Sequence, residues 1–458
     1  MEPFESNALA EWTGGSWHAE QAPELIKGFA FDARLIKAGE CFIALSGGAR
    51  DGHAFCAQAV ASGAIALMVE TVQPIKVPQL VVSDTLLAMG AIANACRSNF
   101  HGSVIGITGS CGKTSTKEML RVLLGDSRTH ATAGNWNNRI GVPMTLFKLD
   151  RERHDFAVIE AGINQPGEMA LLGEMIEPDV ALVTMIGAAH LELLHSLEGI
   201  AMEKSALVNA GKSRSPLITT SSVMNYSAFR KFADRAIVLI EKGASFELPV
   251  AQVVRYELAG TTAGKTELHL ELAGQTELFT VKSASRGICM NAALALTTAY
   301  HLGVSVDLLQ ERLLTWEPQG NRGRIVENGN QSYYVDCYNA NPDSMRDALH
   351  TFRSRMEASP RCYVLGAMNE LGHQAVVLHE QVGGLLKLRA HDVAYFVGPR
   401  EWREAYVKGA LASGARAEQV FAVEKCEEIK SFIAEFSGSI FLKGSRSYAL
   451  ETLLPATP

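Results

Sequence analysis

A glycine-rich turn that could hold phosphate lies near the start of the second hundred residues. Residues 107–115 read ITGSCGKTS. The apolar run SVIGIT (103–108) leads into this segment, and a helical pattern, KEMLRVLLG, follows it. Glycines let consecutive backbone N–H groups face a phosphate, and the following helix N-terminus adds a favourable dipole. Lys113 would reach the β- and γ-phosphates, and the Thr114 hydroxyl would ligate Mg²⁺. The residue five before Gly112 is Ile107 rather than glycine, so the spacing departs from the common loop. The alternative is a glycine-rich turn with a surface lysine.

Two further polar residues follow predicted buried strands. Glu160 ends the run FAVIE, where a carboxylate needs a metal ion or a basic partner, because burying an unpaired charge is costly. His190 comes just after VALVTMI, the kind of position where open α/β sheets bind ligands, although a lone histidine is more often structural. Glu192 either orients nearby groups or is an exposed acid at a helix start.

The elements that must position these residues alternate apolar strands with helices. In the stretch from residue 103 to 186, strands are separated by helical segments such as GEMALLGEMI, which is typical of a mostly parallel sheet covered on both faces. Residues 249–282 read as antiparallel strands added to that domain. The helix NAALALTTAYHLG and a second short helix then close it.

The flanking segments predict two further domains. The first hundred residues combine short strands, glycine-rich turns, an alanine-rich helix from about residue 51 to 62 and the helix TLLAMGAIANACRSNF. After a Pro/Gly-rich linker, EPQGNRGR, the strands YYVDCY, RCYVLGA, VAYFVG and SIFLKGS alternate with helices. We predict an α/β protein with a small N-terminal α/β module (1–101), a central phosphate-loop domain with a mostly parallel sheet (102–316) and a C-terminal Rossmann-like domain (317–458).

Composition excludes several classes of protein. The 458 residues are 47% hydrophobic and 20% charged, which indicates a globular chain of two or three domains. A net charge of -7 argues against a dedicated nucleic-acid binder. The start, MEPFESNALAEWTGG, does not read as a signal peptide, and no apolar run is long enough for a membrane span. Eight cysteines without CxxC pairs favour reduced thiols and a cytoplasmic protein over a zinc site or a disulfide framework.

The loop ITGSCGKTS closely resembles the shortened TGxxGK[ST] loop of the Mur ligase family, and further blocks resemble that family in order along nearly the whole chain. GNWNNRIGVP (134–143) resembles the Asn-rich segment after the loop. VIEAGINQPGEM (158–169) resembles the strand with a magnesium-binding glutamate, here Glu160. IGAAHLELLHSLEGIAMEKSAL (186–207) resembles the AHLE block and the next helix, which carries a reactive lysine.

Blocks at both ends resemble particular members of the family. FDAR, GECFIALSG and DGHAF resemble the uridine-binding module of the members that add the tripeptide's last residue or D-alanyl-D-alanine. Three other blocks resemble the member that adds the dipeptide: DCYNANPDSM (336–345), VLGAMNELG (364–372) and FLKGSR (441–446). The resemblance implies an ADP-forming amide ligase of peptidoglycan precursor synthesis. Such an enzyme would add D-alanyl-D-alanine to UDP-N-acetylmuramoyl-tripeptide through an acyl phosphate, with ATP and two Mg²⁺ ions, and we expect a monomer.

The resemblance also implies roles for individual residues. Lys113, His190 and Lys204 would be catalytic, and Thr114, Glu160, His190 and Lys204 would hold the metal ions. The nucleotide would contact Gly109, Ser110, Cys111, Gly112, Lys113, Thr114, Ser115, Asn291, Arg324, Asp336 and Asn339, while Lys443 and Ser445 would line the face that closes on the acyl phosphate.

Lys204 fits such a site only if its charge is reversed. A cation beside two metal ions and a triphosphate makes little chemical sense, whereas a carbamate formed from its neutral amine and CO₂ would be anionic. The resemblance implies this modification. The alternative is a solvated lysine on an amphipathic helix.

Other predicted residues also have simpler interpretations. Asn291 could be a helix N-cap, Asn339 could cap a turn, and Cys111 could be a small residue that fills the loop rather than a redox-sensitive thiol.

The chain departs from the family pattern at three places: Gly287-Ile288 replaces His-Asn, Ala367 replaces the aspartate of VLGDM, and Val335-Asp336 replaces a pair of aspartates. Three alternatives remain. A family member that uses another amino acid would differ in its substrate, and a non-catalytic nucleotide-binding protein would bind ATP without releasing phosphate. A small-molecule kinase would need an acceptor base near the loop, for which the sequence offers no clear candidate.

Overall fold

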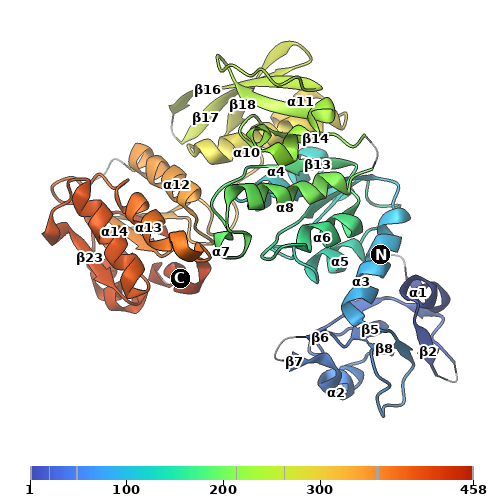
Figure 1. Ribbon diagram of the computed structural model, residues 1–458. Coiled ribbons are helices and arrows are strands. Elements are labelled where there is room, and N and C mark those ends of the chain that lie inside the picture. The colour runs from blue at the N-terminus through green and yellow to red at the C-terminus, as the bar shows by residue number, and fades with distance from the viewer. Residues whose placement is uncertain are drawn as a thin grey trace.

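The computed structural model describes residues 3–19, 21–47, 50–212, 214–262, 264–356 and 360–455. Three main sheets follow one another along the chain, and each is flanked by helices (Figure 1). The first has five strands in the order β2-β9-β8-β5-β4, parallel except for β2. Its elements are α1 (Ser6–Thr13), β2 (Ser16–His18), β4 (Gly28–Ala30), β5 (Glu40–Ile43), α2 (Cys56–Ala61), β8 (Ala66–Val69), β9 (Gln79–Val81) and α3 (Thr85–Ser98). Two short pairs lie beside it, β1 (Phe4–Glu5) with β3 (Leu25–Ile26) and β6 (Ser46–Gly47) with β7 (Arg50–Asp51).

The first sheet is attached to the second by α3 and by aromatic contacts. Arg97, near the end of α3, is fully buried and donates to the Ile176 carbonyl at 2.9 Å and to the Asp179 carboxylate at 2.8 Å. Phe29 of β4 lies 4.9 Å, between ring centroids, from Phe147 of the central region. A buried arginine with several carbonyl and carboxylate partners fixes its neighbours firmly, because leaving any of these groups unpaired is costly.

The second sheet has nine strands in the order β11-β12-β10-β13-β14-β15-β16-β17-β18. It is parallel as far as β16, and β17 and β18 continue it in antiparallel fashion. The strands are β10 (Ser103–Thr108), β11 (Thr129–Ala131), β12 (Phe156–Glu160), β13 (Val180–Val183), β14 (Leu217–Thr220), β15 (Ala236–Glu241), β16 (Gln252–Thr262), β17 (Lys265–Leu272) and β18 (Gln275–Val281). The predicted antiparallel strands are therefore present, joined to the parallel sheet through the pair β15–β16.

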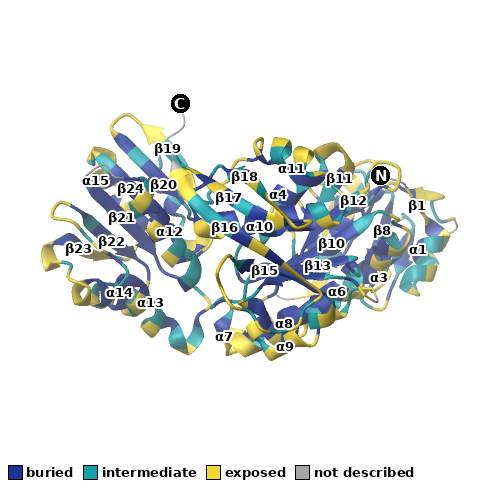
Figure 2. Ribbon diagram, turned by 90° about the horizontal axis from the view of Figure 1, so that it is seen from above, coloured by how far each residue is buried: buried dark blue, intermediate teal, exposed yellow. Residues whose placement is uncertain are grey.

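Helices cover both faces of this sheet, which is why its strands are apolar runs rather than alternating patterns. Ile105 and Ile107 of β10 pack with α4 and α10 on one face, whereas Val104 belongs to the cluster with α6 and α8 on the other. Figure 2 shows the buried residues along β10, β13 and β15 between these helices. The helices are α4 (Lys113–Leu124), α5 (Gly141–Leu146), α6 (Glu168–Ile176), α7 (Leu191–Leu194), α8 (Leu197–Asn209), α9 (Ser227–Arg230), α10 (Arg286–His301) and α11 (Val306–Leu313).

The third sheet has six strands in the order β19-β20-β24-β21-β22-β23, parallel except for β19. Its elements are β19 (Arg324–Asn328), β20 (Gln331–Val335), α12 (Pro342–Arg355), β21 (Arg361–Gly366), α13 (Ala375–Gly383), β22 (Val393–Val397), α14 (Arg400–Ala412), β23 (Val420–Val423), α15 (Lys430–Glu435) and β24 (Gly438–Lys443). It follows a stretch without regular structure between Leu314 and Gly323. Among the described residues, no helix combines the length and the apolar composition that crossing a bilayer requires.

Strand order places the carboxyl ends of β10, β12 and β13 together. The chain passes from β10 to β11 and β12 on one side, then crosses to β13 on the other. In the third sheet, β24 likewise lies between β20 and β21. Ligands of open α/β sheets bind at such reversals, outside the carboxyl ends of the strands. Both reversals therefore mark where the site should lie.

Candidate active site

The phosphate loop joins β10 to α4 and depends on two glycines. Gly109 and Gly112 have φ angles of 148° and 88°, which residues with a Cβ rarely adopt. A Cβ at Gly109 would lie 1.9 Å from the Thr184 hydroxyl oxygen, and one at Gly112 would lie 2.4 Å from Asn291 Oδ1. Neighbouring side chains thus pack directly against the backbone of the loop. Because the two glycines have no side chains, a phosphate would meet the backbone N–H groups of the loop.

Ser110 connects this loop to the segment that carries His190. Its backbone N–H donates to the Met185 carbonyl at 2.9 Å, and its hydroxyl donates to the Gly187 carbonyl, also at 2.9 Å. Gly187 lies three residues before His190, so two backbone positions fix this segment beside the loop. The structure brings together the two motifs that the sequence predicted to share one site.

Lys113 is the first residue of α4, and its side chain extends back toward the phosphate loop. Its Nζ donates to the Gly109 carbonyl at 2.7 Å. Burial lowers the pKa of Lys113, and the Glu160 carboxylate partly opposes that shift. The surface-lysine alternative is wrong, since this ammonium group lies inside the loop, where an anion would be bound.

Glu160, at the end of β12, is 1% exposed and lies in a ring of polar groups. Its Oε1 accepts from Asn137 Nδ2 at 2.7 Å and from the Thr114 hydroxyl at 3.3 Å. Its Oε2 lies 3.9 Å from Lys117 Nζ and accepts no hydrogen bond from the part of the chain that the structure describes. Thr114 and Glu160 therefore adjoin, and the Glu160 oxygen that faces Lys117 accepts no hydrogen bond from the described residues.

Lys117 and Asn137 are two residues of this ring that sequence reasoning missed. Lys117 is fully buried, and its Nζ donates to the Thr132 carbonyl at 2.6 Å and to the Gly134 carbonyl at 2.9 Å. It thereby fixes the start of the Asn-rich segment from which Asn137 reaches Glu160. The available signal was a lysine one helical turn after Lys113, on a face that is otherwise apolar.

Lys117→Met is expected to lower the free energy of unfolding by about 3 kcal/mol, because removing one partner of a buried ion pair leaves the other charge uncompensated. Urea denaturation followed by circular dichroism measures this. The double variant Lys117→Met/Glu160→Gln is expected to recover part of the loss, since it also removes the stranded carboxylate. Equal stability of Lys117→Met and the parent would contradict the role given to this lysine.

His190 precedes α7 and has a left-handed backbone, with φ 60°. Its Nδ1 forms an ion-pair contact with Glu370 of the C-terminal region. This contact is the largest cause of a lowered pKa for Glu370, and burial opposes the shift. His190 thus has a structural partner, but it also lies beside the loop, and the two interpretations are compatible.

Lys204 lies on the buried face of α8 and is fully inaccessible. Its Nζ forms no hydrogen bond with any residue that the structure describes. Burial shifts the pKa of Lys204 well below its ordinary value, and the nearby Lys113 ammonium lowers it further. The solvated-lysine alternative is therefore wrong, and burial disfavours the charged form of this amine.

Asn291 corrects one interpretation, because it does not begin a helix. The helix α10 begins at Arg286, and Ser285 caps it by accepting from the Ile288 N–H at 3.0 Å. Asn291 therefore lies in the second turn, 8% exposed, with its amide against Gly112. The N-cap interpretation is wrong, and the side chain faces the phosphate loop.

The C-terminal region presents charged groups to the same loop. Lys443 ends β24 and pairs with the Asp336 carboxylate, which follows β20, at 2.6 Å. Lys443 Nζ also donates to the Asn339 carbonyl at 3.1 Å. Burial raises the pKa of Cys111, which is further shifted by charges from both sheets: Lys443 and Lys113 lower it, and Asp336 raises it. Charges from both the central and the C-terminal regions therefore act on the cysteine of the loop.

Other C-terminal candidates occupy simpler positions. Asn339 Oδ1 accepts from the Ala340 N–H at 2.8 Å, as a turn-capping side chain does. Arg324 is exposed at the start of β19, while the neighbouring Arg322 stacks 3.8 Å from the centroid of the Tyr338 ring. The Ser445 hydroxyl accepts from the Asn369 N–H at 2.9 Å, which is a contact within the C-terminal region.

Two departures from the family pattern have structural roles here. The Gly287 N–H donates to Asp347 of α12 at 3.2 Å, and the Ser285 hydroxyl donates to the same carboxylate at 2.5 Å. Ala367 is fully buried, and its backbone bonds to Val397 at 2.9 Å. The first position is therefore a contact between the central and C-terminal regions, and the second is part of the third sheet's core.

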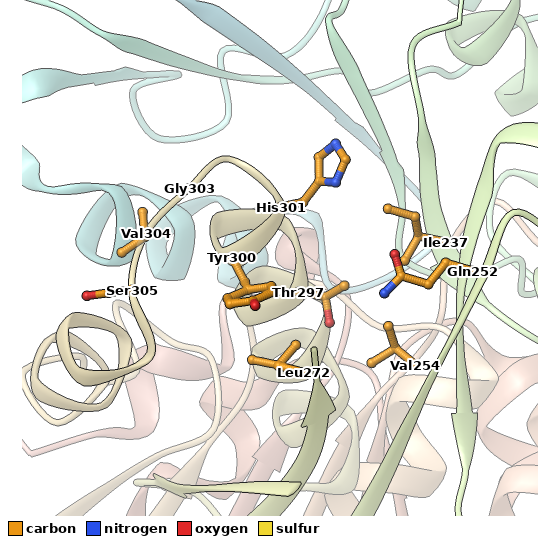
Figure 3. Close-up of a pocket in the computed structure, with 10 residues that line it drawn as sticks. All are labelled: Ile237, Gln252, Val254, Leu272, Thr297, Tyr300, His301, Gly303, Val304 and Ser305. Carbon is orange, nitrogen blue, oxygen red and sulfur yellow. The ribbon is translucent and has the colours of Figure 1, made fainter. Parts of the chain in front are cut away.

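A cavity of about 450 Å³ opens near the far end of α10. Figure 3 shows Thr297, Tyr300 and His301 of that helix facing Gln252 and Val254 of β16. None of its lining residues belongs to the phosphate loop or to the groups around Glu160 and His190. The chemistry therefore lies elsewhere, between the central and C-terminal sheets.

Comparison with known proteins identifies the family. Residues 107–299 match the Mur ligase middle domain, and residues 321–446 match the Mur ligase, glutamate ligase domain. Together these matches cover more than half of the sequence. The chain belongs to the Mur ligase family.

Relatives that match nearly the whole chain point to one member of the Mur ligase family. The chain is 33% identical to the UDP-N-acetylmuramoyl-tripeptide--D-alanyl-D-alanine ligase of Escherichia coli (strain K12), over 93% of this chain and 92% of that protein. It is 30% identical to the ligase of the same name from Treponema pallidum, over 93% of each. A crystal structure of MurF from Acinetobacter baumannii superposes with a TM-score of 0.87 at 29% identity, covering 99% of this chain and 98% of that one. The predicted α/β fold class is confirmed.

Proposed function

We propose that the chain is an ATP-dependent, ADP-forming ligase that joins D-alanyl-D-alanine to UDP-N-acetylmuramoyl-tripeptide in peptidoglycan precursor synthesis. Relatives that bear this activity in their names match nearly the full length at 30% and 33% identity. One observation within the site supports ligase chemistry most directly: a fully buried, unpaired Lys204 beside the phosphate loop. A kinase or a simple nucleotide-binding protein has no evident need for such an amine.

The proposed reaction begins with phosphoryl transfer. A carboxylate oxygen of the tripeptide attacks the γ-phosphorus of ATP, its bond to the β,γ-bridging oxygen breaks, and ADP leaves with an acyl phosphate formed. The chain contributes mainly position and positive charge. Lys113 would release the Gly109 carbonyl and neutralise charge on the β- and γ-phosphates, while the loop N–H groups hold their oxygens.

Amide formation completes the reaction. The free amine of D-alanyl-D-alanine attacks the acyl carbon, inorganic phosphate leaves, and the amine loses a proton. We propose that Lys443, at the end of β24, contributes positive charge on the side of the departing phosphate, because its charge also acts on Cys111 of the loop. Asp336 holds this lysine by an ion pair at 2.6 Å.

We propose that the site binds two Mg²⁺ ions. Thr114 and Oε2 of Glu160, which accepts no hydrogen bond within the described chain, form one oxygen-rich corner, and Mg²⁺ prefers such ligands. His190 and a carbamate on Lys204 would hold the other ion; burial disfavours the charged form of this amine, and a neutral amine can capture CO₂. When bound, the ions would neutralise charge between the triphosphate and the substrate carboxylate.

The proposal extends to the organisation of the molecule. We assign uridine binding to residues 1–101, ATP binding to 102–316 and closure over the acyl phosphate to 317–458, with the nucleotide also contacted by Asn291, Arg324, Asp336 and Asn339. We further propose that the chain acts as a monomer in the cytoplasm; all eight cysteines are free thiols, which suits a reducing compartment.

Measurement of phosphate release with one substrate omitted at a time tests the function. We expect release only when ATP, UDP-N-acetylmuramoyl-tripeptide and D-alanyl-D-alanine are all present, and mass spectrometry should show a peptide product longer by two alanines. Release that ignores either omission would overturn the assignment. Preference for a single amino acid would indicate another activity within the family, and a phosphorylated acceptor would indicate a kinase.

Asp347→Ala is expected to weaken closure of the C-terminal region, because Asp347 bonds to Ser285 at 2.5 Å and to the Gly287 N–H at 3.2 Å. Small-angle scattering with ADP and both substrates should show less compaction than in the parent. Glu404→Gln, an exposed substitution on α14 far in sequence from these contacts, is the control and should compact normally. Identical scattering from Asp347→Ala and the parent would contradict this role.

A further inference from the structure

Glu370 belongs to the C-terminal region, yet it lies against the predicted metal ligand of the central region. It comes after β21, and its carboxylate contacts His190 Nδ1. The Glu370 carbonyl also accepts from the Glu192 N–H at 3.0 Å, so the contact is held at the backbone as well. Figure 1 shows α7, which begins immediately after His190, at the boundary with the C-terminal region.

The segment around Glu192 and the segment around Gly372 approach each other closely. A Cβ at Gly372 would lie 2.9 Å from Glu192 Cα, so no side chain fits between the backbones. His190 and Glu370 both have left-handed backbones, with φ 60° and 64°. Non-glycine residues adopt this conformation infrequently, and such positions cluster at functional sites. Two facing residues share it here.

A carboxylate on one ring nitrogen of histidine determines what the other nitrogen can do. The Glu370 carboxylate lies against Nδ1 of His190, although the two groups do not have the orientation of a hydrogen bond. A carboxylate at Nδ1 leaves Nε2 as the ring nitrogen available to a metal ion. Carboxylates that orient metal-binding histidines in this way commonly come from the surroundings of the site. Here the carboxylate comes from the region that must close over the substrate.

We propose that Glu370 is a positioning residue that orients His190 for the second metal ion only when the C-terminal region is closed. This inference rests on the proposed function. It links closure to assembly of the metal site: in an open molecule Glu370 leaves, and the imidazole loses the partner that fixes the orientation of its ring. The segment at Glu192 and Gly372 provides the contact that brings Glu370 back to the same place.

Mn²⁺ bound with ADP and UDP-N-acetylmuramoyl-tripeptide is the probe. Electron spin-echo modulation detects a histidine nitrogen on Mn²⁺, and titration gives the Mn²⁺ affinity. The parent is expected to show the nitrogen signal and His190→Ala to lose it. Glu370→Ala should lose most of the signal and weaken Mn²⁺ binding by roughly 10–100-fold. Glu370→Gln, which keeps the size of the side chain and an oxygen that can face Nδ1, should retain part of both.

Two further variants separate orientation from closure and from general damage. Asp347→Ala weakens closure without touching His190, so its nitrogen signal should fall in proportion to the loss of compaction that small-angle scattering measures. Glu404→Gln removes an exposed acid from the same region and should leave affinity and signal unchanged. Circular dichroism establishes that each variant is folded, and the conservative Glu370→Gln serves if Glu370→Ala is not.

The outcomes distinguish this inference from the proposed function. Unchanged nitrogen signal and Mn²⁺ affinity within twofold in both Glu370 variants would overturn the inference alone. A parent that makes the amide but shows no histidine nitrogen on Mn²⁺ would also overturn it. A parent that forms no amide product at all would overturn the proposed function itself.

Discussion

Lys204→Ala is expected to lower turnover by about 10²–10³-fold, the usual cost of removing one group that stabilises charge in the transition state. Lys204 is fully buried, and its pKa is shifted well below the ordinary value, mainly by burial. The neutral amine would carry the carbamate that helps to hold the second metal ion. Steady-state phosphate release with all substrates present measures the loss.

Chemical rescue makes this prediction specific. Alanine at position 204 leaves a cavity next to the loop, and a short carboxylic acid such as acetate or propionate could supply the missing anion there. We expect added acid to restore part of the turnover of Lys204→Ala. Lys242→Ala, which removes an exposed lysine on the same region, is the control and should stay fully active. Near-parental activity of Lys204→Ala without added acid would show that no carbamate is needed.

Lys113→Ala is expected to abolish turnover, with a loss of at least about 10³-fold, while the fold remains intact. Lys113 Nζ lies inside the loop, bonded to the Gly109 carbonyl at 2.7 Å, and no other ammonium group in the described residues is bonded to this loop backbone. Alanine suits the first turn of α4, so the helix should be preserved. Single-turnover formation of ADP measures the chemical step directly.

Two comparisons control for indirect effects of Lys113→Ala. Its urea denaturation curve should follow that of the parent, in contrast to the destabilised Lys117→Met. Lys113→Arg keeps the charge but replaces a compact ammonium with a larger planar group, and it should retain only weak activity. Surviving turnover in Lys113→Ala would place the phosphate site elsewhere in the molecule.

Most strands were predictable because both faces of the parallel sheets are covered. The apolar run predicted at residues 103–108 is strand β10, from Ser103 to Thr108, and FAVIE is strand β12. Strands β19 and β23 were missed, since several of their residues are exposed and they do not form apolar runs. Strands β14 and β15 were not predicted either, although both are buried. The alanine-rich helix is shorter than predicted: a 3-10 turn from Gly52 to Phe55 precedes α2.

The site was predictable where motifs are local and not where contacts are long-range. The loop, Glu160 and Lys204 could be found from spacing and from resemblance, although their roles remain proposals. Lys117 and Glu370 could not, because the sequence does not show that the first lies under the Asn-rich segment or that the second meets His190. Asn291 was misplaced because Ser285, a good N-cap, was not considered as the helix start.

The firm attachment of the first sheet to the second has a consequence for substrate length. Arg97 and the contact between Phe29 and Phe147 join these two regions, so they should move as one body. Under the proposed function, that body would bind the uridine end of the substrate at one position and the substrate carboxylate at another. The fixed distance between the uridine site and the γ-phosphate site would then select the length of the substrate. A stem peptide one residue too short would leave its carboxylate out of reach of the γ-phosphate, whatever its side chains.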